Sequence, residues 1–311
     1  MNNPLDSSLS SVFDVHVHPI RSIISAKSLI DEMDRSGVSK AVILALDLEP
    51  NILTTDLKLR EEIIDDLWAY SYFINPEQLL DSMTRILQTG VTSNDQVAEI
   101  RNSYPDRFIG FGSVNPSKSK SYVSSKLDEI LSLGLHGIKL IPTLQFFHPQ
   151  KNKNVKRIFK FAAKQNWPIL IHTGKDPGPF EIPTLRHVQY SHPRFWEKLV
   201  KKTTVKVIFA HLGGYGVTDD ESWINSALDI ARYNSNVFLD TSAVTYALED
   251  PNTVAKLRDI GFDHILFGSD HPVVHGTSME HSKNIILKSP ILTEEEKRII
   301  LFENAQKLFP S

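Results

Sequence analysis

Near the start of the chain, the segment FDVHVHPI (residues 13–20) alternates an aspartate and two histidines with apolar residues. Because successive side chains of a β-strand point to opposite faces, this spacing predicts that Asp14, His16 and His18 share one face. Imidazole and carboxylate groups bind zinc and other first-row divalent ions. The segment therefore predicts part of a metal site, and its alternative interpretation is a solvated strand at the edge of a sheet.

Four more ionisable side chains lie in or shortly after other apolar segments. They are Lys139 in GIKLI, His172 after PILI, His211 after VIFA and Asp270 after ILFGS. An ionisable group at the end of a buried strand is unfavourable unless it has a partner. If these strand ends meet, the side chains form one site. Taken singly, His172 could be a core histidine, His211 or Asp270 could cap a helix, and Lys139 could form an ion pair.

The residue types in this set predict metal-assisted chemistry. The sequence has no cysteine, so a metal must be bound by histidine, a carboxylate or a modified lysine. A bound divalent ion lowers the pKa of water and so provides a nucleophile, and a neighbouring carboxylate can accept the proton. Asp14 is interpreted as a hydrogen-bond acceptor that supports a ligand, not as a ligand itself.

The segments that carry these side chains belong to a regular alternation of strands and helices. Eight apolar runs of strand length occur: SVFDVHV, KAVILAL, RFIGFGSV, HGIKLI, PILIHT, VKVIFAH, NVFLDTS and HILFGSD. Amphipathic segments typical of helices separate them. This order predicts an α/β fold, either a (β/α)8 TIM barrel or an open doubly wound sheet. We favour the barrel, because eight strands fit closure and no G-x-G-x-x-G turn follows the first strand.

One connection, at about residues 48–102 between the second and third strands, is too long for a single crossover helix. Its segments EEIIDDLWAYSYF and PEQLLDSMTRIL predict a helical insertion that caps one mouth of the barrel. We interpret residues 1–311 as a single domain that contains this insertion. Two helix ends are also predicted: Gly37 closes the helix AKSLIDEMDRS, and Thr293 with Glu296 forms a capping box.

Composition excludes several classes of function. Of the 311 residues, 41% are hydrophobic and 23% charged, as in globular proteins, and the net charge of −3 does not favour nucleic acid as a partner. No apolar run approaches the roughly 18 residues needed to span a membrane. The N-terminal segment lacks the layout of a secretory signal, so we expect a cytoplasmic protein with a small-molecule substrate. A homodimer is compatible with an inserted cap.

The sequence resembles the amidohydrolase superfamily, and within it the branch of amino-carboxymuconate-semialdehyde decarboxylase and the resorcylate decarboxylases. The matching motifs span nearly the whole chain in the family's order: DVHVHP (14–19), GIKL (137–140), PILIHTG (168–174), AHLGG (210–214), FGSDHP (267–272) and ENAQKLF (303–309). The resemblance implies a distorted barrel and a divalent ion, usually zinc, with manganese as an alternative. It implies the metal ligands His16, His18, His172 and Asp270.

The resemblance also implies roles for two further residues. His211 corresponds to an acid/base or carbonyl-polarising group beside the metal. Lys139 lies where other branches carry a carbamylated lysine that bridges two metals. The decarboxylase-like branch generally works with one metal, so we favour one ion, with Lys139 contacting substrate or the polar network, over a second bridged metal.

Three functions remain open at this stage. The first is hydrolysis, in which a metal-activated water attacks an ester, lactone or amide carbonyl while Asp270 and His211 act as catalytic groups. The second is non-oxidative decarboxylation or hydration of a small unsaturated or aromatic carboxylic acid. It requires a cation for the carboxylate, for which Arg21 and Arg60 are weak candidates, so we favour the hydrolase. The third is a metal-binding sensor without catalysis, which would not need His211.

Overall fold

Each of the eight apolar segments forms one β-strand in the computed structural model, which describes residues 11–20, 24–175, 178–214, 220–274 and 277–309. The strands are β1 (Phe13–Val17), β2 (Lys40–Leu44), β3 (Phe108–Ser113), β4 (Ile138–Leu140), β5 (Ile169–Ile171), β6 (Val207–Phe209), β7 (Val237–Asp240) and β8 (Ile265–Leu266). They run parallel, and each pairs with the next along the chain. Val15 N–H also donates to Phe267 O at 2.9 Å, which links the first strand to the last. The nearly closed barrel confirms the predicted fold.

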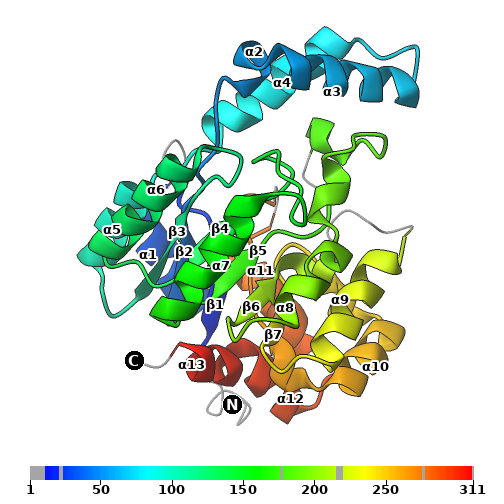
Figure 1. Cartoon of the computed structure of the whole chain (residues 1–311). Helices are drawn as coiled ribbons and strands as arrows, with labels where there is room; N and C mark the ends of the chain where they lie inside the picture. Colours follow the sequence, from blue (N-terminus) through cyan, green and yellow to red (C-terminus); the bar gives the residue numbers. More distant parts are fainter. Residues whose placement is uncertain (1–10, 21–23, 176–177, 215–219, 275–276, 310–311) are drawn as a thin grey trace.

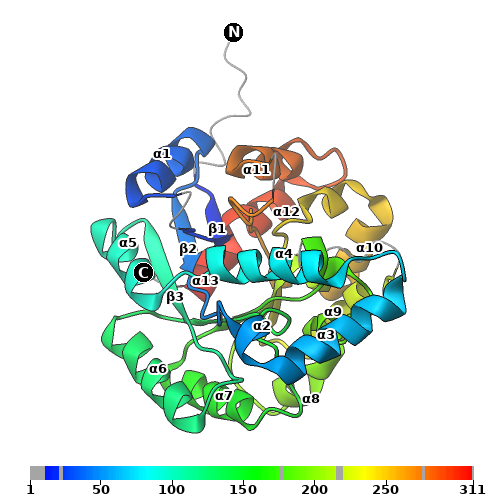
Figure 2. The same cartoon turned by 90° about the horizontal axis from the view of Figure 1, so that it is seen from above.

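Helices surround this ring of strands on the outside, as Figures 1 and 2 show. The α-helices of the described residues, of which α2, α3 and α4 lie above the ring, are α1 (Ala26–Ser36), α2 (Ile52–Thr55), α3 (Leu57–Tyr70), α4 (Pro76–Thr89), α5 (Asn94–Ser103), α6 (Lys120–Ser132), α7 (Lys153–Gln165), α8 (Glu197–Val200), α9 (Ser222–Arg232), α10 (Pro251–Ile260), α11 (Met279–Lys288), α12 (Glu294–Arg298) and α13 (Asn304–Leu308). Both predicted helix ends are confirmed: Gly37 closes α1 with φ +66°, and Thr293 and Glu296 form the capping box of α12. Within the described residues, no helix has the length and apolar character needed to cross a membrane.

Alternating side chains of the strands pack into two separate cores. Phe13 and Val15 of β1 point into the barrel, where Phe309 after α13 closes the lower end. Ile138 and Leu140 of β4 point outward and pack against the surrounding helices. This alternation follows from the period of two in an extended strand, and it determines which residues at the strand ends face the mouth of the barrel.

Strand β1 departs from the predicted alternation. Val15 packs inside the barrel but Val17 packs outside it, and the register with β2 shifts between Asp14 and Val17. The Asp14 Oδ1 accepts the backbone N–H of His16 and that of Ser269, each at 3.0 Å. The prediction that Asp14, His16 and His18 share one face is therefore wrong. The irregularity in β1 places Asp14 on a different face of the strand from the two histidines.

Helices α2, α3 and α4 lie over the carboxyl end of the barrel, and Figure 2 shows α4 crossing above the ring. Their apolar residues form a core with Leu46 and Leu48 after β2, with Leu144 after β4 and with Leu185 after β5. By contrast, α5 packs on β3 and belongs to the ring. Helices thus occupy the region in which an inserted cap was predicted. That these helices are an insertion stays a prediction.

Candidate metal centre

Two histidines and one aspartate bring three donor atoms together at the carboxyl end of the barrel. The Nε2 atoms of His16 and His18 lie 3.1 Å apart, and each lies 3.4 Å from Oδ1 of Asp270. All three side chains are buried. The ligand atoms of a tetrahedral zinc ion are about 3.3 Å apart, because Zn–N bonds are about 2.05 Å long. The three donors therefore fit one divalent ion in both type and spacing.

Asp240 determines how the His16 ring is oriented. Its Oδ2 lies 2.8 Å from Nδ1 of His16. A carboxylate only accepts hydrogen bonds, so Nδ1 carries the proton and Nε2 presents its lone pair to the metal position. Burial alone would raise the pKa of Asp240, but the His16 ring and the surrounding hydrogen bonds outweigh it and lower the pKa below its ordinary value.

The sequence interpretation did not single out Asp240. The residue ends the apolar strand β7, as the other site residues end theirs. Its neighbour Leu239 packs in the outer core, so alternation points Asp240 into the barrel. Applying the strand-end rule to all eight strands would have found it.

Asp270 reaches the site from an unusual backbone conformation. Its φ is +62°, and its N–H donates to the carbonyl of His16 at 2.9 Å. Burial tends to raise its pKa, but the electrostatic interaction with His16 and the hydrogen bond with His18 lower it to about 2. The carboxylate is therefore ionised at neutral pH, as a metal ligand must be.

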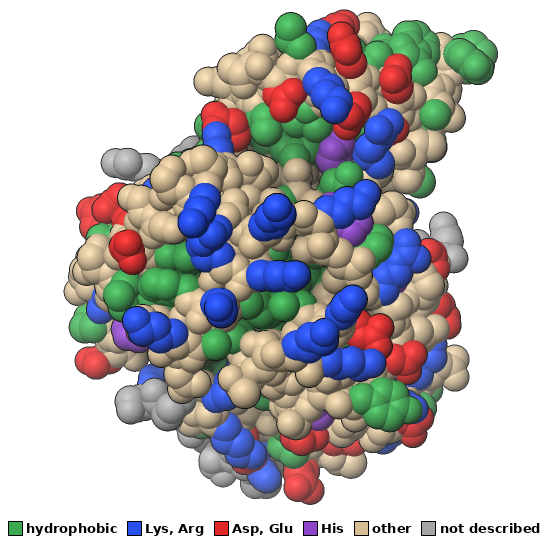
Figure 3. Space-filling view, viewed as in Figure 1, with side chains coloured by type: hydrophobic (Ala, Val, Ile, Leu, Met, Phe, Trp, Pro, Cys, Tyr) green, Lys and Arg blue, Asp and Glu red, His purple; other side chains and the backbone are tan. Residues whose placement is uncertain are grey.

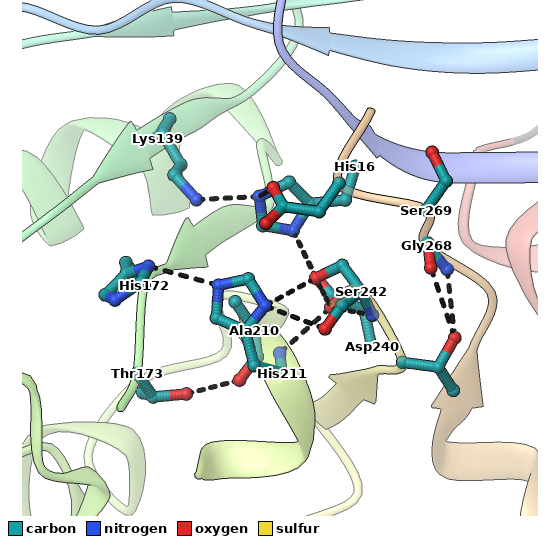
Figure 4. Close-up of polar contacts among 12 residues, drawn as sticks. His16, Lys139, His172, Thr173, Ala210, His211, Asp240, Ser242, Gly268 and Ser269 are labelled. Carbon is teal, nitrogen blue, oxygen red and sulfur yellow. Dashed lines mark hydrogen bonds and ion pairs between the residues drawn. The ribbon is translucent and has the colours of Figure 1, made fainter. Parts of the chain in front are cut away.

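Lys139 lies beside the three donors. Its neighbours in β4 pack outward, so its side chain points into the barrel, where Nζ lies 3.1 Å from Nε2 of His16 (Figure 4). Burial, followed by the charge of Lys139, lowers the pKa of His16 to about 3, so the imidazole is neutral at pH 7. The predicted role of Lys139, contact with substrate or with the polar network, stays a prediction.

His172 and His211 form a second pair next to this cluster. Nε2 of His211 lies 3.1 Å from Nδ1 of His172, and Nδ1 of His211 lies 2.8 Å from both the carbonyl and the hydroxyl oxygen of Ser242 (Figure 4). Because a carbonyl only accepts, Nδ1 of His211 carries a proton and donates to Ser242, while Nε2 of His211 faces His172. His211 also belongs to a second group of three close donors, with His16 and Asp240. His172 belongs to neither group of three, so its role as a ligand stays a prediction.

The backbone after β6 turns sharply to present His211. His211 has φ +57° and Gly213 has φ +85°, and the His211 N–H donates to Asp240 Oδ1 at 3.0 Å. An added Cβ at Gly213 would lie 2.3 Å from the Cβ of Ala227 in α9. Contacts this short do not occur, so either α9 or the His211 turn would have to move.

We expect Gly213→Ala to destabilise the protein by about 2–4 kcal/mol, from overpacking and an unfavourable φ. Gly214→Ala is the matched control, because its φ is −144° and its Cβ would lie no closer than 3.7 Å to the described residues packed against it. Urea unfolding of both variants measures the difference between their free energies of unfolding. Equal stability of the two would show that the turn is not sterically constrained.

Comparison with known proteins extends the resemblance over the whole barrel. The family model described as Amidohydrolase matches residues 13–311. No curated protein matches the sequence.

Three solved structures share this fold. An uncharacterised TIM-barrel protein from Bordetella bronchiseptica has a TM-score of 0.65 at 16% identity, over 96% of this chain and 98% of its own. A probable 2-pyrone-4,6-dicarboxylic acid hydrolase from Acinetobacter baumannii has a TM-score of 0.59 at 13% identity, over 96% and 98%. A 5-carboxyvanillate decarboxylase from Novosphingobium aromaticivorans, with bound manganese, has a TM-score of 0.59 at 16% identity, over 93% and 82%. At these identities the structural likeness supports the fold alone.

Proposed function

The chain belongs to the amidohydrolase family, and we propose that it is a metal-dependent hydrolase of a small ester or lactone. The observation that carries this proposal is the triangle of His16, His18 and Asp270, whose donor atoms lie 3.1–3.4 Å apart. Such a triangle leaves part of a metal's coordination available to water and substrate.

These residues would hold one divalent ion, zinc in the first instance, with His172 as the proposed fourth ligand and a fifth position left for water. The manganese in the decarboxylase structure makes manganese the alternative. A bound ion would act as a Lewis acid and lower the pKa of water. Lys139, at 3.1 Å from His16, would contact substrate or the polar network rather than bridge a second metal.

Three side chains would have different roles in hydrolysis. Asp270 is ionised at neutral pH and would accept the proton of the attacking water. His211, fixed by Ser242 and by the Asp240 contact to its backbone, would polarise the scissile carbonyl. Asp240 would keep His16 in the tautomer that binds metal.

Decarboxylation of a small unsaturated or aromatic carboxylic acid is the second candidate, favoured by the structural similarity to the manganese-bound 5-carboxyvanillate decarboxylase. This reaction needs a cation for the carboxylate. Arg60 pairs with Glu77 on the cap, and Arg186 pairs with Asp66 at 2.8 Å. Arg21 lies outside the described residues. Lys139, 3.1 Å from His16, is the cation that a carboxylate would meet at the centre, so the paired arginines do not separate the two reactions, and we keep decarboxylation as the second proposal.

A substrate panel tests the two reactions together. The metal-loaded protein is given cyclic lactones, such as pyrone carboxylates, and hydroxylated benzoates, while acid release and carbon dioxide are measured in parallel. We expect acid release from a lactone that depends on about one equivalent of metal. Carbon dioxide without acid release would replace the hydrolase with the decarboxylase. Turnover of neither, with metal bound, would favour the sensor.

A further inference from the structure

A cavity of about 720 Å³ opens at the amino ends of the strands, opposite the metal centre. Lys40 is the first residue of β2, Arg107 directly precedes β3, and Lys206 directly precedes β6. Trp167, just before β5, and Phe309, after α13, complete part of its wall. Because catalytic groups of this fold gather at the carboxyl ends, the cavity is not part of the metal site.

The lining of this cavity carries an excess of positive charge. Among the described residues, Lys40, Arg101, Arg107 and Lys206 line it, against one carboxylate, Asp106. A cavity with low-dielectric walls and one dominant sign of charge concentrates ions of the opposite sign. The lining therefore favours an anion.

The bonds of the two arginines show which charges are available to such an anion. Arg107 Nη2 pairs with Asp34 at 2.8 Å, so its charge is largely matched. Arg101 Nη2 instead donates to the carbonyls of Leu133 and Gly134, each at 2.9 Å. Those partners are neutral, so these bonds leave the charge of Arg101 uncompensated.

Two further observations agree with a positive potential in this region. Burial, followed by the charge of Arg101, lowers the pKa of His136, which also lines the cavity. Helix α7 ends at Gln165 in the cavity wall and has no acidic residue. Its four exposed lysines are Lys153, Lys156, Lys160 and Lys164. Figure 3 shows Lys and Arg side chains across the middle of the face that α7 occupies in Figure 1.

The remaining wall is apolar and aromatic. Phe108, Trp167 and Phe309 line the cavity, and because these side chains are mostly buried, a planar ring would pack against the part that each exposes. The volume is within the range of small-molecule sites and much larger than a single inorganic anion requires. We infer that this cavity binds a small organic phosphate that carries a planar ring, with the phosphate held by Lys206 and Arg101.

Adenosine monophosphate is the probe, titrated into the full protein by calorimetry alongside adenosine and inorganic phosphate. We expect AMP to bind with a submillimolar Kd, and each fragment to bind at least tenfold more weakly. Binding should persist after a chelator has removed divalent ions, which separates this cavity from the metal centre. Absence of AMP binding at millimolar concentration, or its loss on chelation, would overturn the inference.

Variants of Lys206 test whether AMP binds in this cavity. Lys206→Glu is expected to weaken AMP binding at least tenfold, and Lys206→Arg to keep it within about threefold. Lys160→Glu on the exposed face of α7 is the matched control, expected to change the affinity less than twofold because Lys160 does not line the cavity. Thermal unfolding verifies that each variant is folded. Equal weakening by both glutamate variants would indicate a diffuse surface effect and reject the cavity.

Discussion

Asp270→Asn is expected to lower metal affinity at least 100-fold and to reduce kcat/KM at least 1,000-fold. The substitution keeps the size of the side chain but removes the charge that the structure stabilises by lowering the pKa of Asp270 to about 2. It also removes the group proposed to accept the proton of water, so residual metal binding would not restore activity. Metal content by mass spectrometry and lactone hydrolysis at saturating metal measure the two losses separately.

Asp14→Asn is the matched control for this substitution. Asp14 is also buried near His16, but the carboxylate oxygen in use accepts two backbone N–H groups, which an asparagine oxygen accepts equally well. We expect metal content and activity of Asp14→Asn to stay within about threefold of the parent. If Asp270→Asn retained stoichiometric metal and turnover, Asp270 would be neither ligand nor base, and the proposed centre would be rejected.

The predictability of this site from sequence depends on the periodicity of its strands. The eight apolar runs are short, β-branched and nearly continuous, so they identify buried parallel strands without further information. Strand ends then identify Lys139, His172 and Asp270 as residues near one mouth. Asp240 obeys the same rule, because it is the last residue of β7.

Other features depend on contacts that periodicity does not encode. The irregularity of β1 moves Val17 to the outer core, and it coincides with the bond from His16 N–H to Asp14. A local bond from a side chain to the backbone offers the chain an alternative to regular strand geometry, and sequence spacing alone does not show which of the two conformations forms. The pairing of His211 with His172 depends on a left-handed turn at His211, a non-glycine residue for which that conformation is uncommon.

The Asp240→Asn variant tests whether Asp240 sets the tautomer of His16, rather than which atoms bind the metal. Asp240 contacts the ring of His16 through Oδ2, and the backbone N–H groups of His211 and Ser242 through Oδ1, at 2.8, 3.0 and 3.0 Å. In the asparagine variant, Oδ1 can keep the two backbone bonds, which leaves the amide NH₂ facing Nδ1 of His16. Because that amide donates, Nδ1 must accept, and the proton moves to Nε2, where it blocks metal binding.

We therefore expect Asp240→Asn to lower metal affinity about 10- to 100-fold, with a smaller loss of folding stability than of metal binding. Nitrogen NMR of the imidazoles provides the readout that a purely structural role would not change: the His16 proton should move from Nδ1 to Nε2. Ser242→Ala is the comparison, since it removes the hydroxyl contact at 2.9 Å to the same nitrogen but leaves the carboxylate. Asp240→Asn with parental metal affinity and an unprotonated Nε2 would show that His16 does not depend on Asp240 for its tautomer.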